Sequence, residues 1–237
     1  MRCPPRHSFF EGGSAFSRFH TLCHSRPPTK PSVALRPLLR LWSAIRRVNL
    51  LVNATIKPDV VLCLHYNAEA WGDATSPQFS PANHLHVLVN GCYAPVELQQ
   101  QDVRFEMLHR LFSRIHEEEL PLAEAVAGGM SSATALPAYL YTTPNARRVG
   151  TSPYVYARNL LANRLYQCPV VYLEPYVMNH EETYRRLLHG HFLGRTLIAG
   201  RLQSSAIEDY VRGVVNGVVM PAISIALLLN AARWPDW

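Results

Sequence analysis

Two residues with the chemistry of a catalytic site stand directly after apolar segments that are typical of buried strands. His65 follows Val60–Leu64, and Glu174 follows Val170–Leu173. In an open α/β sheet, ligands bind beyond the carboxyl ends of the strands. A neutral imidazole is a good zinc ligand, and a carboxylate in nonpolar surroundings has a raised pKa that suits a general base. The two positions therefore predict a metal ligand and a proton acceptor at one site.

Each of these residues also has a structural interpretation. A single histidine after a strand is commonly a hydrogen-bonded structural group, and Glu174 could equally cap a helix or join an ion pair. His84 and His86 have the spacing that places two rings on one face of a strand. We expect these two to be loop and sheet-surface histidines rather than replacement metal ligands.

The elements that must position these residues alternate along the chain. The predicted strands are Val60–Leu64, Leu85–Val89 and Pro169–Leu173, each expected to be buried on both faces. Apolar spacing and capping patterns predict helices over residues 38–52, 103–115, 122–127, 154–166, 179–191 and 205–218. The Glu117–Glu119 run is expected at the solvated end of the second helix, and Gly128-Gly129 at the end of the third. This alternation predicts an α/β domain with a mainly parallel sheet flanked by helices.

Charge and composition divide the chain into three parts. The 237 residues are 48% hydrophobic, which excludes wholesale disorder. We assign residues 1–40 to a basic, proline-rich arm, 41–219 to the α/β domain and 220–237 to a hydrophobic tail. Since no aromatic platform or nucleic-acid motif accompanies the arm, we expect a solvated segment, with nucleic-acid binding as the alternative. No apolar run is long enough to predict a membrane span.

Two segments carry a family resemblance. Residues 58–68 read Pro-Asp-Val-Val-Leu-Cys-Leu-His-Tyr-Asn-Ala and resemble the strand and His-x-Asn-Ala signature of the zinc-dependent N-acetylmuramoyl-L-alanine amidases (the amidase_3 group). Residues 168–174 read Cys-Pro-Val-Val-Tyr-Leu-Glu and are similar to that family's Pro-Ala-Val-Leu-Val-Glu strand. Asn179–Glu182 resembles its Ser-Asn-x-x-Glu segment. The resemblance covers residues 44–218.

The resemblance implies a zinc-dependent hydrolase that cleaves the amide between N-acetylmuramic acid and L-alanine in peptidoglycan, in the cell envelope or outside the cell. In the family, two histidines and one glutamate hold the zinc ion, and a separate glutamate takes the proton of the attacking water. By position, His65 matches one zinc ligand and Glu174 matches the base. Asn67 matches a polar residue that faces the substrate, and a structural turn role fits its sequence equally well.

The chain also departs from the family pattern. The family's other two zinc ligands precede this point, in a Gly-His-Gly turn and on the following helix. Here the preceding candidates, His7, Glu11, His20 and His24, lie among prolines with no apolar strand to place them, and no export signal is visible. We therefore expect an amidase-like domain without its first βα unit and with an incomplete zinc site, a change that can leave such a domain inactive. The alternative is a non-catalytic module or remnant that binds cell-wall glycopeptides without metal.

Overall fold

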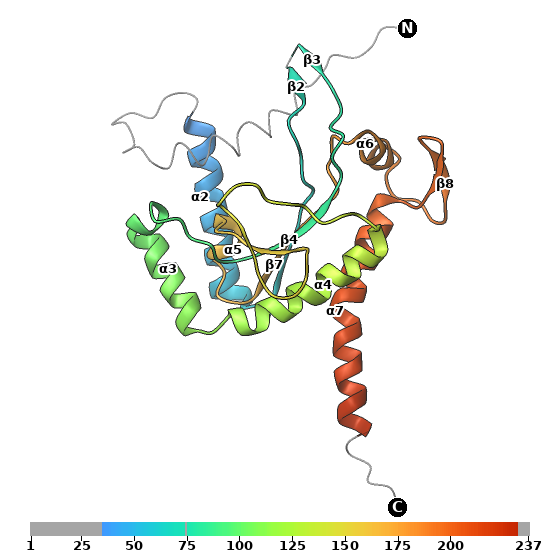
Figure 1. The fold of residues 1–237 in the computed structure, drawn as a ribbon. Helices are drawn as coiled ribbons and strands as arrows, with labels where there is room; N and C mark the ends of the chain where they lie inside the picture. Colours follow the sequence, from blue (N-terminus) through green and yellow to red (C-terminus); the bar gives the residue numbers. More distant parts are fainter. Residues whose placement is uncertain (1–34, 74, 232–237) are drawn as a thin grey trace, which may run out of the picture.

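A five-stranded sheet forms the centre of the molecule (Figure 1). The computed structural model describes the backbone of residues 35–73 and 75–231 and the side chains of residues 43–73 and 75–219. The strands lie in the order β1 (Val61–Leu64), β7 (Val170–Pro175), β4 (Leu85–Val89), β6 (Val155–Ala157) and β5 (Arg147–Arg148). All three predicted strands are therefore present.

The sheet is mixed. β1 pairs with β7 and β4 pairs with β6 in parallel, whereas β4 is antiparallel to β7 and β5 is antiparallel to β6. The predicted α/β class, with helices flanking the sheet, is confirmed. The antiparallel β4–β7 pairing has a direct consequence for the site, because it places the beginning of β4 beside the carboxyl end of β7.

The helices and short hairpins have the following bounds. The helices are α2 (Leu35–Leu51), the π-helix η1 (Val52–Ile56), the 3-10 helix η2 (Glu97–Gln99), α3 (Gln101–Phe112), α4 (His116–Thr134), α5 (Leu161–Arg164), α6 (Glu181–Leu188) and α7 (Ala206–Ala231). Two hairpins are formed by β2 (Gly72–Asp73) with β3 (Ser76–Pro77) and by β8 (Thr196–Ile198) with β9 (Arg201–Gln203). None of the helices within the described residues is long and apolar enough to cross a membrane.

The main core lies between one face of the sheet and α4. Inward-facing residues of β4, β6 and β7 pack against α4, and Ala206 and Tyr210 of α7 join the same cluster. A smaller cluster of Leu88, Tyr156 and Tyr172 covers the opposite face. β1 forms an edge of the sheet, and its residues are partly exposed. The expectation that the first strand is buried on both faces is therefore wrong, because an edge strand has a neighbour on one side only.

The helix predicted over residues 122–127 is longer than expected. α4 begins at His116 and continues through Gly128-Gly129 to Thr134. The glycines do not end the helix, because Gly129 packs against the backbone of Gly213 and Gly217 in α7, where any side chain would clash. The Glu117–Glu119 run belongs to the first turn of α4, and Glu119 is buried against Arg110 instead of being solvated.

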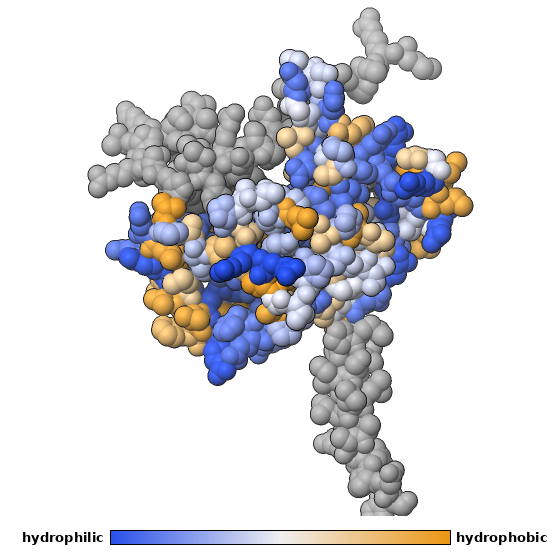
Figure 2. All heavy atoms as spheres, viewed as in Figure 1, coloured by the Kyte–Doolittle hydropathy of each residue, from blue (hydrophilic) through white to orange (hydrophobic). Residues whose placement is uncertain are grey.

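Two other helix predictions also need correction. The segment Tyr154–Tyr166 forms strand β6 and the short helix α5, since Val155 and Tyr156 complete the sheet beside β4. The α3 helix is present, but most of its apolar residues do not reach the core. Figure 2 shows the hydrophobic surface over this helix, where Phe105 and Phe112 are 71% and 77% exposed.

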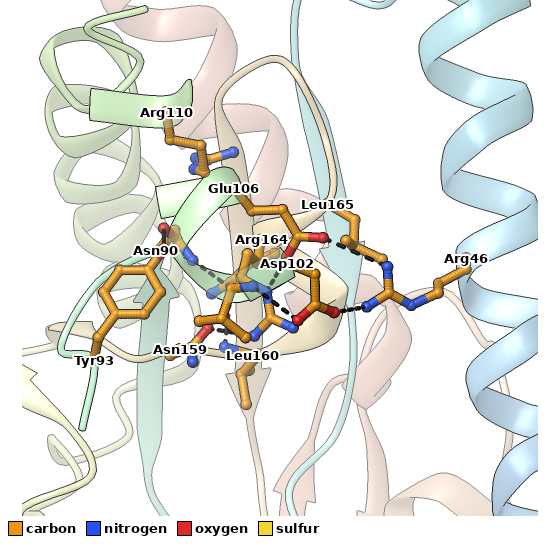
Figure 3. A network of polar contacts seen from close by, with 12 residues as sticks. Arg46, Asn90, Tyr93, Asp102, Glu106, Arg110, Asn159, Leu160, Arg164 and Leu165 are labelled. Carbon is orange, nitrogen blue, oxygen red and sulfur yellow. Dashed lines mark hydrogen bonds and ion pairs between the residues drawn. The ribbon is translucent and has the colours of Figure 1, made fainter. Parts of the chain in front are cut away.

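A network of charged side chains joins α2 and α3 to α5 (Figure 3). Buried Arg164 donates to Glu106 at 2.5 Å and to Asn159 at 2.7 Å. Arg46 of α2 donates to Asp102 at 2.7 Å and also reaches Glu106 at 3.5 Å. Because Glu106 is shared between the two arginines, the network ties α3 to both α2 and α5. The described helix α2 includes residues 35–40 of the segment that we assigned to the arm, and residues 1–34 lie outside the described residues.

Candidate active site

His65, Glu174 and His86 form a row across three neighbouring strands. His65 directly follows β1, Glu174 lies in β7, and His86 stands opposite Glu174 in the antiparallel ladder of β4 and β7. The Nδ1 atom of His65 lies 3.3 Å from Oε1 of Glu174. The Nε2 atom of His86 contacts the other carboxylate oxygen, Oε2. The two residues predicted from the sequence are therefore brought together, and a third that we expected to be structural joins them.

The electrostatics of Glu174 differ from the sequence expectation. Burial alone raises the pKa of this carboxyl group, but hydrogen bonds from His65 and His86 outweigh the burial and lower its pKa to about 2. The expectation that the pKa of Glu174 is raised is therefore wrong. The hydrogen bonds stabilise the ionised carboxylate by more than burial destabilises it. At neutral pH, Glu174 is a carboxylate that holds two imidazoles. It is a weak proton acceptor by itself.

The exposed imidazole of the row is His65. Its side chain is 45% exposed, whereas that of His86 is 1% exposed. Because Nδ1 of His65 faces Glu174, the Nε2 atom lies on the opposite side of the ring. The carboxylate thus orients an accessible imidazole, which is the arrangement by which an acid–base histidine is held in catalytic triads.

Tyr210 of α7 fixes the backbone at His65. Its buried hydroxyl accepts from the His65 amide at 3.1 Å and lies within hydrogen-bond distance of the carbonyl oxygens of His65, at 3.1 Å, and Leu173, at 3.4 Å. The His65 amide also donates to the carbonyl of Leu173 at 3.0 Å. Tyr210 therefore ties α7 to the ends of β1 and β7.

The loop after His65 is held by Asn179. The side-chain amide of Asn179 donates to the Glu69 carbonyl at 2.8 Å and accepts from the Glu69 amide at 2.9 Å. The helix predicted over residues 179–191 begins at Glu181 with His180 as its N-cap, and Asn179 is buried before it. Asn67 makes backbone bonds to the Tyr176–Met178 segment, and its side chain accepts from the amide of Ala68 at 2.8 Å. Its predicted role in substrate binding stays a prediction.

His84 and His86 are buried and belong to the site. Nε2 of His84 lies 3.3 Å from Oε1 of Glu69, and its ring centroid lies 4.3 Å from that of Tyr139. Burial lowers the pKa of His84, and the nearby charge of His86 acts in the same direction. The description of both as surface histidines is therefore wrong. The i, i+2 spacing of the two histidines is visible in the sequence. The contact between His86 and Glu174 depends on the pairing of β4 with β7, which no local sequence pattern predicts.

The described side chains do not fit a zinc site. Zinc in a catalytic site takes three protein ligands around one point. Here the facing nitrogens of His65 and His86 are directed at separate oxygens of Glu174, so a carboxylate stands between them. Within residues 43–73 and 75–219, no three His, Cys, Asp or Glu side chains are grouped so that they could hold a metal ion. His7, Glu11, His20 and His24 lie outside the described residues.

Comparisons with known proteins give a likeness to a solved structure. No family model matches the sequence, and no curated protein matches it. Among solved structures, the fold is similar to the apo form of the N-acetylmuramyl-L-alanine amidase Ami1 from Mycobacterium abscessus, with 18% sequence identity and a TM-score of 0.44. The match covers 74% of this chain, which spans 60% of the length of that chain.

Proposed function

We propose that this chain carries the site of an amide hydrolase of the N-acetylmuramoyl-L-alanine amidase type, with peptidoglycan or its muropeptides as substrate. The observation that carries the proposal is the meeting of His65 and Glu174 at the ends of two parallel neighbours, β1 and β7. These are the two positions at which the sequence resembles that family. The substrate class comes from this resemblance.

The chemistry assigned to the chain's own residues is proton transfer. Glu174 acts as a positioning residue in this scheme, because its carboxylate holds His65 and stabilises the imidazolium. In this scheme, His65 accepts a proton through Nε2 as water attacks the amide carbon. It then donates that proton to the amine as the carbon–nitrogen bond breaks. Asn67 is the proposed polar contact to the substrate.

Zinc enters the proposal through the family resemblance alone. As a ligand, His65 would use a nitrogen lone pair that the scheme above assigns to proton transfer, so the two roles exclude each other at that atom. A zinc site would also require two further ligands. Metal analysis of the purified protein separates the roles: stoichiometric zinc that is lost in His65→Ala assigns His65 as a ligand, and zinc-independent turnover assigns it to proton transfer.

Product analysis tests the proposed reaction. We expect hydrolysis of N-acetylmuramoyl-L-alanyl-D-isoglutamine to give N-acetylmuramic acid and the dipeptide L-alanyl-D-isoglutamine. The new amino group of the dipeptide is detected by amine labelling and mass spectrometry. Cleavage at any other bond, or no product from the wild-type protein, would contradict the proposal.

A non-catalytic glycopeptide-binding module is the second candidate, and the weak basicity of the Glu174 carboxylate, which two imidazoles hold ionised, favours it. Such a protein would bind muropeptides and leave them intact in the same assay.

A further inference from the structure

Three aromatic side chains form a partly exposed ridge where the segment that follows His65 meets helix α6. The ring centroids of Trp71 and Phe79 lie 6.0 Å apart, and those of Phe79 and Tyr184 lie 5.4 Å apart. Phe79 is 42% exposed and Tyr184 is 39% exposed, while Trp71 is partly buried. We call these three residues the aromatic ridge. Trp71 and Phe79 flank the β2–β3 hairpin, and Tyr184 comes from α6, which lies beside that hairpin in Figure 1.

The ridge is held by the same contacts that shape the candidate site. The Gln78 amide donates to the Trp71 carbonyl at 2.8 Å and closes the base of the hairpin. The Ser80 amide donates to the carbonyl of Asn179 at 2.9 Å, and the side chain of Asn179 binds Glu69 in the loop that begins at His65. Asn179 therefore holds both ends of the hairpin that carries Trp71 and Phe79, in the segment of the chain that begins at His65.

The charges around the ridge favour a neutral ligand. Arg185 pairs with Glu181 at 2.7 Å, and Arg201 lies 3.7 Å from Glu182. Arg186, two residues after Tyr184, pairs with Asp209, so these three arginines all have carboxylate partners. An acidic stem peptide would need a cation to receive its carboxylates. Exposed aromatic faces instead suit the C–H face of a sugar ring, because they combine apolar area with a weakly negative π surface.

We propose that the aromatic ridge binds the glycan strand of peptidoglycan by stacking pyranose rings on Trp71, Phe79 and Tyr184. This inference rests on the proposed function for its choice of polymer, and it adds a binding site outside the His65–Glu174–His86 row. Exposed apolar patches commonly mark ligand-binding surfaces, and aromatic side chains are enriched among the residues that anchor a partner.

The test is glycan binding, measured apart from hydrolysis. The probe is a set of peptidoglycan glycan strands from which the peptides have been removed, titrated into the full-length protein by calorimetry. We expect Trp71→Ala and Tyr184→Ala each to weaken binding by about tenfold, as loss of an anchoring aromatic typically does. Phe105→Ala, which removes an exposed ring of α3, is the matched control and should leave binding unchanged. Equal affinity of Tyr184→Ala and wild type would overturn the inference.

Two further measurements keep the test decisive. Thermal unfolding identifies a variant that has lost the hairpin rather than the ligand, and Tyr184→Phe, which keeps the ring, should bind as the wild type does. Hydrolysis of N-acetylmuramoyl-L-alanyl-D-isoglutamine, which has no glycan strand, reports on the proposed reaction. Glycan binding without this hydrolysis would support glycan binding by the aromatic ridge and contradict the proposed reaction. Hydrolysis without glycan binding would contradict glycan binding by the aromatic ridge.

Discussion

His86 stands directly opposite Glu174 in the antiparallel ladder of β4 and β7, and its Nε2 atom contacts the carboxylate of Glu174. The two residues are 88 positions apart in the sequence. The pairing explains how a buried carboxylate stays ionised, because its pKa is lowered through hydrogen bonds from two imidazoles against the opposing effect of burial. It also makes β4 a part of the site.

Replacing His86 by phenylalanine should destabilise the fold. The substitution keeps an aromatic ring beside Tyr139 and Tyr141 but leaves Glu174 without one of its two partners. A lost hydrogen bond to a charged group costs about 1.5–3 kcal/mol. Urea unfolding of His86→Phe measures this loss, with the exposed His189→Ala as the control. A variant as stable as the wild type would contradict the contact.

Removal of the buried carboxylate of Glu119 should be costly. This side chain pairs with Arg110 at 2.5 Å and accepts from the amide of Val170 at 2.9 Å, at the beginning of β7. Glu119→Ala leaves the arginine buried and unpaired, which typically costs about 3–5 kcal/mol. The exposed neighbour in the same turn, Glu118→Ala, should change the free energy of unfolding by less than about 0.5 kcal/mol. Similar effects of the two substitutions would show that Glu119 is solvated.

Two adjacent glycines should respond to alanine in opposite directions. A methyl group at Gly129 would clash with the backbone of Gly213 and Gly217, whereas one at Gly128 meets open space. Gly129→Ala should therefore destabilise by about 1–3 kcal/mol through overpacking. Gly128→Ala should stabilise by about 0.5–1 kcal/mol, because alanine is the better helix former. Stabilisation by both changes would contradict the close approach of α4 and α7.

The carboxylate of Glu124 should make part of the stability dependent on pH. Hydrogen bonds from the backbone amides of Ser152 and Thr151 lower the pKa of Glu124 below its ordinary value of 4.5. A lowered folded-state pKa gives stability that is present above 4.5 and is lost as the pH falls through the folded-state pKa. The wild type should therefore be more stable than Glu124→Gln at neutral pH, and urea unfolding should show this difference shrinking in acid. A difference that is constant with pH would contradict the assignment.

The sequence predicted three of the five strands of the sheet, because each of the three is a mainly apolar run between clear breakers. Leu85–Val89 has the predicted bounds, and β1 and β7 differ only at their ends. The meeting of His65 and Glu174 followed from the rule that places ligands at strand ends. The local pattern of apolar residues was sufficient to predict a strand where the strand itself is a mainly apolar run.

The errors arose where contacts distant in sequence decide the structure. Gly128-Gly129 reads as a helix end, but packing against α7 allows α4 to continue. Tyr154–Tyr166 has helical spacing, but Val155 completes the sheet beside β4. The role of His86 and the lowered pKa of Glu174 both depend on the antiparallel neighbour of β7, for which the sequence holds no local signal.

The most direct measurement is the turnover of N-acetylmuramoyl-L-alanyl-D-isoglutamine by the wild-type protein and by Glu174→Gln. The variant keeps the size of the side chain but removes the charge that holds His65. We expect its turnover to fall by about 10²–10⁴-fold, the range typical of acid–base catalysis, with a circular dichroism spectrum like that of the wild type. Equal turnover of the two proteins would contradict the role of the Glu174 carboxylate in holding His65 for proton transfer.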